Sequence, residues 1–177
     1  MKATRLAIVT AVGATILSLT GISFWSTQSA LAWDGPGGDE GCTPGYWKQE
    51  HHFDSWPTDT TYLAGGVHPD TPLEDVLGHG GNVLEGTPWD DITMLEALKL
   101  KGGGGNALIR QGAAGILNAL STEVDYNMSL ETAIRNILDG LDPLYIDLDG
   151  PFYGDDDDLE KRKNFLEAAN EMGCPLN

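Results

Sequence analysis

The run NALIRQGAAGILNAL at residues 106–120 has the apolar spacing of a helix that is buried on one side. Its broad apolar face comprises Leu108, Ile109, Ala113, Ile116, Leu117 and Leu120. A stripe of small residues, Gly112, Gly115 and Ala119, flanks this face. The run therefore predicts a helix that begins near Asn106 and that a neighbouring helix can approach closely.

Thr-Pro pairs predict the starts of further helices. Threonine supplies an N-cap oxygen, and a proline at the first helical position needs no N–H partner. We expect one helix to start at Thr43-Pro44 and a short one to start at Thr71-Pro72. The second should end near Gly78, with Glu74 placed to complete a capping box.

Two longer helices are predicted on either side of the 106–120 run. Thr87-Pro88 should open a helix that ends at the glycine run 102–105. After a turn near Tyr126, Ser129 should cap a helix whose stop signal is Gly140.

The C-terminal part of the chain completes the expected fold. Asp142-Pro143 should start a further single turn, and a last helix should run from about residue 158 to residue 172. No segment of useful length alternates as a half-buried strand would. We expect an all-α fold, a single small domain over 42–177 with five or six short helices and glycine-rich loops.

The first 32 residues have the order of an export signal. Lys2 and Arg5 precede a long apolar run, and the segment ends Ala30-Leu31-Ala32. We expect cleavage after Ala32 and a secreted or extracellular protein, periplasmic in a host with two membranes. An uncleaved membrane anchor is the alternative, because roughly twenty apolar residues span a bilayer. Residues 33–41 read as a flexible lead.

The charge of the exported chain excludes several partners. Without the signal, the chain has eight basic and 27 acidic residues, which gives a formal charge of −19. Such a surface repels nucleic acid and anionic lipid and attracts cations and basic partners. We expect no nucleic-acid partner and, after signal cleavage, no membrane partner.

Two cysteines, Cys42 and Cys174, lie near the two ends of the exported chain. In an oxidising compartment the default expectation is a disulfide, which would close a loop of 133 residues and join the termini. In the chain-entropy model such a loop stabilises by roughly 4 to 5 kcal/mol. The alternative is a zinc site in which both cysteines join His51 and His52.

Two parts of the chain resemble a known class of proteins. The first is Cys42-Thr43-Pro44-Gly45-Tyr46-Trp47-Lys48, and the second is the glycine run 102–105 with the helix Ala107–Ala119. Together they resemble secreted bacterial modules that begin with a CTPGYWK motif and later carry a Gly-rich turn and an Ala- and Leu-rich helix. The resemblance covers Cys42 to about Tyr126. It implies an exported module and carries no catalytic residue across.

The histidines after this motif are candidates for a metal site. If one helix continues from Thr43, Trp47 and His51 lie on one face, and Asp54 can orient the imidazole of His51. His51 and His52 would then be ligands of a metal-binding protein or a hydrolase. Surface or packing histidines are the competing interpretation, because no metal-ligand motif of known spacing is present.

The tryptophans raise the same choice between binding and packing. Trp47, Trp56 and Trp89 could stack on sugar rings, which predicts a carbohydrate-binding module with Trp47 and Trp56 as ligand-binding residues. Large rings also dominate the cores of small domains, and this favours packing.

An acidic segment near the C-terminus is a candidate calcium site. It contains Asp147, Asp149, Asp155, Asp156, Asp157 and Asp158. Calcium prefers such oxygen ligands, although the twelve-residue loop pattern fails at its first and last positions. The alternative is a solvated charge run whose last members cap the final helix.

These features favour a non-enzymatic module of the cell surface or extracellular matrix. It would act through surface contacts with a polysaccharide or a cell-surface protein, with weak calcium binding. The chain has no nucleophile elbow, phosphate-binding loop or dinucleotide fingerprint.

Overall fold

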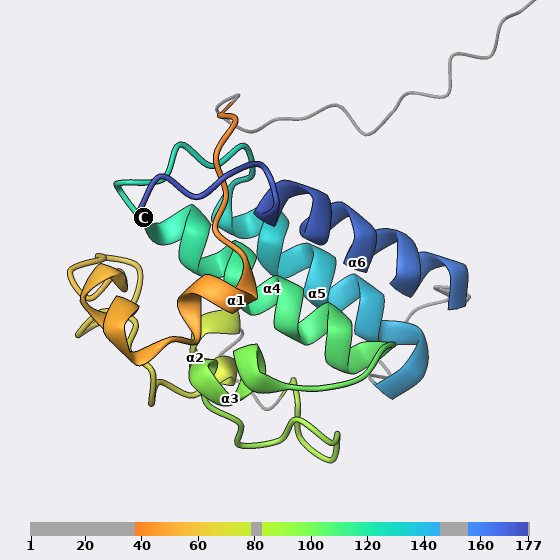
Figure 1. Cartoon of the computed structure of the whole chain (residues 1–177). Coiled ribbons are helices and arrows are strands. Elements are labelled where there is room, and N and C mark those ends of the chain that lie inside the picture. The colour runs from red at the N-terminus through yellow and green to blue at the C-terminus, as the bar shows by residue number, and fades with distance from the viewer. Residues whose placement is uncertain (1–37, 79–82, 146–155, 177) are drawn as a thin grey trace, which may run out of the picture. The chain divides into compact units, whose positions relative to one another are not determined.

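The computed structural model describes residues 38–78, 83–145 and 156–176, and these residues belong to one compact unit. They form helices and contain no strand, which confirms the all-helical expectation (Figure 1). The elements are α1 (Pro44–Trp47), the 3₁₀ helix η1 (Glu50–Ser55), α2 (Leu73–Leu77), α3 (Met94–Lys99), α4 (Gly105–Leu120), α5 (Leu130–Tyr145) and α6 (Asp156–Asn170). The predicted signal, residues 1–32, lies outside the described residues.

Helices α4, α5 and α6 lie side by side and pack against one another (Figure 1). The small residues of α4 permit this approach. A Cβ atom at Gly112 would collide with the side chain of Ile137 in α5. At Gly115 it would lie 3.3 Å from Cδ2 of Leu166 in α6. The close approach expected from the 106–120 run is confirmed.

The expected stop of α5 at Gly140 is wrong. The helix continues to Tyr145, so Asp142-Pro143 lies inside α5 and starts no separate turn. Gly140 is needed for packing, because a Cβ atom there would lie 2.6 Å from Cδ2 of Leu108 in α4. The expected cap is confirmed, since Ser129 Oγ accepts the N–H of Thr132 at 3.2 Å.

Only one of the three Thr-Pro starts, that at Thr43-Pro44, is confirmed in full; a short helix follows Thr71-Pro72, but its N-cap is Pro72 rather than Thr71, and no side chain caps it. Thr43 caps α1, although α1 is a single turn. Helix α2 begins at Leu73 and ends at Gly78, whose φ of 73° is the left-handed conformation that favours glycine. The capping box with Glu74 does not form, because Thr71 Oγ1 accepts the N–H of His68 at 2.8 Å instead.

The helix expected at Thr87-Pro88 starts later. Thr87 Oγ1 donates to the Leu84 carbonyl at 2.6 Å, and Asp91 has a φ of 60°, so residues 87–91 form turns. Helix α3 is capped by Thr93, whose side chain and the Glu96 side chain form a reciprocal capping box.

A disulfide joins Cys42 to Cys174, with their Cα atoms 4.4 Å apart. Beside it the Gly41 N–H donates to the Gly173 carbonyl at 2.9 Å. The bond is compatible with an oxidising, extracellular location. In the part of the chain that the structure describes, no helix is both long and apolar enough to cross a membrane.

The end of the expected flexible lead is part of the fold. The Glu40 N–H donates to the Asp125 carbonyl at 3.2 Å, and Glu40 Oε2 accepts the N–H of Asp125 at 2.7 Å. Residues 38–41 therefore run beside the loop that precedes α5.

Candidate functional site

The CTPGYWK segment is bound to α4 by one buried side chain. Asn118 Oδ1 accepts the Cys42 N–H at 2.9 Å and the Trp47 Nε1–H at 3.0 Å. Its Nδ2 donates to the Cys42 carbonyl at 2.9 Å. Asn118 has no exposed surface, so each of these bonds lies in the core.

A second buried amide, that of Asn170, continues this network into α6. Its Oδ1 accepts from Asn118 Nδ2 at 2.9 Å and from the Tyr126 hydroxyl at 2.8 Å. Its Nδ2 donates to the backbone carbonyl and to Oε1 of Gln111 at 2.9 and 3.0 Å. Burial raises the pKa of Tyr126, so its hydroxyl stays protonated and donates. The network joins the N-terminal segment, α4 and α6.

The tryptophans are packing residues. Trp47 is fully buried, and Trp56 and Trp89 are buried as well. The Trp56 Nε1–H donates to the Trp47 carbonyl at 3.1 Å, and the Trp89 Nε1–H donates to Asn106 Oδ1 at 2.8 Å. The expectation that Trp47 and Trp56 form an exposed sugar platform is wrong, because neither ring reaches solvent.

His51 and His52 lie in η1, beyond the end of α1. The continuous helix expected from Thr43 is wrong, because Gln49 is extended and separates α1 from η1. The ring of His52 stacks on Tyr46 with centroids 3.8 Å apart, and the His51 ring lies 4.1 Å from that of His52. His51 and Asp54 are exposed, whereas Trp47 is buried.

The zinc alternative with two cysteine ligands is also wrong, since Cys42 and Cys174 are bonded to each other. Within the described residues, no three His, Cys, Asp or Glu side chains are placed to hold one metal ion. A metal site at His51 and His52 would need ligands from elsewhere.

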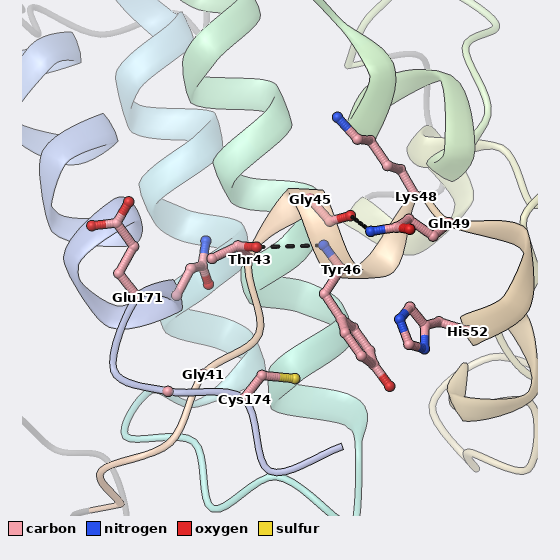
Figure 2. Close-up of a pocket in the computed structure, with 11 residues that line it drawn as sticks. Gly41, Thr43, Gly45, Tyr46, Lys48, Gln49, His52, Glu171 and Cys174 are labelled. Atoms are coloured by element: carbon pink, nitrogen blue, oxygen red, sulfur yellow. Dashed lines mark hydrogen bonds between the residues drawn. The ribbon is translucent and has the colours of Figure 1, made fainter. Parts of the chain in front are cut away.

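A pocket of about 580 Å³ lies between the α1–η1 segment and the end of α6 (Figure 2). One side is lined by Thr43, Gly45, Tyr46, Lys48, Gln49 and His52, and the other by Gly41, Asn170, Glu171, Gly173 and Cys174.

The pocket presents both donors and acceptors. Lys48 and Glu171 are exposed and carry opposite charges on the two sides. Gln49 Nε2 donates back to the Gly45 carbonyl at 3.0 Å, which turns the amide toward α1 (Figure 2). Such a lining suits a ligand that carries several hydrogen-bonding groups.

No family model, curated protein or solved structure matches this chain. Its site is therefore interpreted from its own geometry.

The acidic segment is described only at its C-terminal end. Asp147, Asp149 and Asp155 lie outside the described residues. Asp156 and Asp157 are the first two residues of α6. Asp158 Oδ2 accepts from Arg162 Nε at 3.1 Å. Calcium binding by the whole run stays a prediction, and so does the alternative in which its last members cap the final helix.

The sequence patterns did not single out as site residues the three amides that make buried hydrogen bonds in this region, Gln111, Asn118 and Asn170. Gln111 and Asn118 lie seven apart in α4, so they share a face with Gly115. Two amides on a stripe of small residues are a usable signal, because buried amides need partners. Asn170 gave no comparable signal, since its partners lie 44 or more positions away.

Proposed function

We propose that this chain is a non-enzymatic module, exported to the cell surface or extracellular matrix, that acts by binding a partner at the α1–α6 pocket. The single observation that carries this proposal is the division of roles within one segment, residues 42–52, which begins with the CTPGYWK motif. Cys42 and Trp47 are bonded into the core, whereas Lys48, Gln49 and His52 line an open pocket. The segment thus builds the wall of a polar recess and offers side chains to it.

The chemical groups that line the pocket indicate which kind of partner it can bind. A cation, an anion, an amide and hydroxyl groups face the recess. Saccharide hydroxyls and peptide groups both offer the donors and acceptors that such a lining can pair. A cell-surface polysaccharide or protein with these groups is the expected partner.

Export is supported by the signal-like residues 1–32, the disulfide and the formal charge of −19 without that segment. Membership in the class of CTPGYWK modules would agree with this location. N-terminal sequencing of native material tests it: a chain that starts at Trp33 supports the proposal. A full-length chain in the cytoplasm, with both thiols free, would contradict it.

Binding is tested by NMR titration of residues 33–177 with oligosaccharides and peptides from the host envelope. Shifts should concentrate at Lys48, Gln49 and Glu171. The Lys48→Glu variant should weaken binding at least about tenfold, because it places a second carboxylate at the recess. Lys161→Glu, the same change at an exposed position in the first half of α6, is the control. Equal loss in both variants, or shifts elsewhere, would reject the pocket.

Metal binding at His51, His52 and Asp54 is the second candidate, favoured by the two adjacent imidazole rings. Metal analysis of protein purified without a histidine tag separates the two functions. Stoichiometric zinc or copper that is lost in His51→Ala would replace the first proposal.

A further inference from the structure

The two halves of the disulfide are held in different ways. Cys42 has no exposed surface, and both its N–H and its carbonyl are bonded to the Asn118 side chain at 2.9 Å. These bonds do not depend on the sulfur. Cys174 is partly exposed and lines the pocket. We therefore expect a thiol from solvent to approach the disulfide from the Cys174 side rather than from the Cys42 side.

Among the described residues, Asn170 is the last fully buried one, and the segment that carries Cys174 follows it. Asn170 is fully buried and bonded to α4, whereas Glu171, Met172 and Gly173 are exposed. The contacts of residues 171–176 include the Gly41 N–H to the Gly173 carbonyl at 2.9 Å and the Tyr46 hydroxyl to the Leu176 carbonyl at 3.0 Å. Asn127 Nδ2 also donates to Met172 Sδ at 2.8 Å, and Cys174 and Leu176 pack against the core, but no residue of 171–176 is fully buried. A segment without fully buried residues is expected to open at a lower free-energy cost than the helices.

The same segment forms one side of the pocket. Glu171, Gly173 and Cys174 line the pocket together with residues of α1 and η1. Figure 2 labels Glu171 and Cys174 on this segment. The pocket therefore combines residues from opposite ends of the chain, and a covalent bond connects its two sides.

We propose that the Cys42–Cys174 disulfide is a latch that holds residues 171–176 against the N-terminal segment, so that the pocket is complete only in the oxidised protein. Reduction would free this segment while Asn118 keeps the N-terminal segment on α4. The consequence for ligand binding rests on the function proposed above. The role of the disulfide in holding residues 171–176 is independent of that function.

The redox step is an ordinary dithiol exchange. A dithiol thiolate attacks the Cys174 sulfur, the sulfur–sulfur bond breaks, and Cys42 leaves as a thiolate. The second thiol of the reductant then attacks the mixed disulfide and releases Cys174. Two electrons and two protons pass to the protein, and the reductant becomes a cyclic disulfide.

Two adjacent amides give a direct test. The Gly41 N–H donates to the Gly173 carbonyl, in the segment 171–176, and the Cys42 N–H donates to the Asn118 side chain of α4. Hydrogen exchange is measured by NMR on residues 33–177, oxidised and then reduced with dithiothreitol, with two free thiols confirmed by titration. We expect exchange at Gly41 to rise at least about tenfold and exchange at Cys42 to change by less than about threefold.

The Cys174→Ser variant should reproduce the reduced pattern without reductant. If that variant does not fold, the reduced wild-type protein still provides the measurement. Faster exchange at both amides would show that the N-terminal segment detaches together with residues 171–176. No change at either amide would show that the disulfide is not needed to hold residues 171–176 in place. Both results overturn the latch, and neither depends on a pocket ligand. Loss of ligand shifts on reduction is the separate test of the pocket.

Discussion

The Asn118 side-chain amide donates to the Asn170 side-chain carbonyl at 2.9 Å, between two residues that have no exposed surface. This contact links α4 to α6. Asn118 also binds both backbone groups of Cys42, so the start of the folded chain depends on the same amide.

Replacing Asn118 should therefore cost much of the stability. In Asn118→Leu the Cys42 backbone, the Trp47 ring and Asn170 lose partners, at about 1–3 kcal/mol for each buried group. We expect the free energy of unfolding in urea to fall by about 4 kcal/mol or more.

Asn136→Leu is the matched control for this change. Asn136 is also buried in a helix, but its amide donates to the Thr132 carbonyl of its own helix. We expect a loss of about 1 kcal/mol there. Similar losses in the two variants would contradict a special role for Asn118.

The α4–α5 contact requires a glycine. In Gly112→Ala the new methyl group meets the Ile137 side chain, so we expect a destabilisation of about 1–3 kcal/mol in spite of the better helix propensity of alanine. The change should be partly relieved in the double variant with Ile137→Ala. Gly103→Ala is the control, because a Cβ atom there meets nothing within 4 Å. If the destabilisation of the double variant equals the sum of those of Gly112→Ala and Ile137→Ala, the close contact is refuted.

The α3 capping box predicts a pH dependence. Hydrogen bonds from the backbone and then the side chain of Thr93 lower the pKa of Glu96. Because the folded pKa lies below the unfolded one, this bond stabilises the fold above the ordinary carboxyl range. The contribution is lost as the pH falls through the folded pKa. NMR titration of the Glu96 carboxyl should show the lowered pKa in the wild type.

In Thr93→Ala the Glu96 pKa should return toward its ordinary value. Loss of the cap should also destabilise the protein by about 1 kcal/mol. A pKa that is equally low in the variant would show that the Thr93 side chain contributes nothing to it.

Calcium should raise the melting temperature if the acidic run binds it. Asp147, Asp149, Asp155, Asp156 and Asp157 supply the carboxylates, and a ligand that binds only the native state stabilises it. Differential scanning calorimetry at millimolar calcium is the measurement. The Asp147→Asn, Asp149→Asn double variant should lose the shift. An unchanged melting temperature in the wild type, together with a flat calorimetric titration with calcium, would contradict the predicted calcium site.

Local signals account for the parts of the fold that were predicted correctly. Thr43, Ser129 and Gly78 act within one helical turn, and the apolar face of α4 repeats within a single helix. The stop expected at Gly140 is wrong because a glycine can mark either a helix end or a close helix contact, and Gly140 is a contact. Its partner, Leu108, is remote in sequence.

The candidate site was harder to predict for the same reason. The CTPGYWK motif drew attention to the correct segment, yet the burial of Trp47 depends on α4, and the pocket needs the end of α6. The sequence alone does not distinguish a buried aromatic ring from an exposed one.

The sequence by itself determined the helical class, the caps at Thr43, Ser129 and Gly78 and the small-residue stripe of α4, and it favoured the pairing of the two cysteines. Each follows from short-range spacing or from there being two sulfurs. Only the tertiary structure decided which side chains are buried, which glycine is a contact and which residues share a pocket. Those properties arise when segments 25 to 130 positions apart meet, as Gly112 meets Ile137 and Tyr46 meets Leu176.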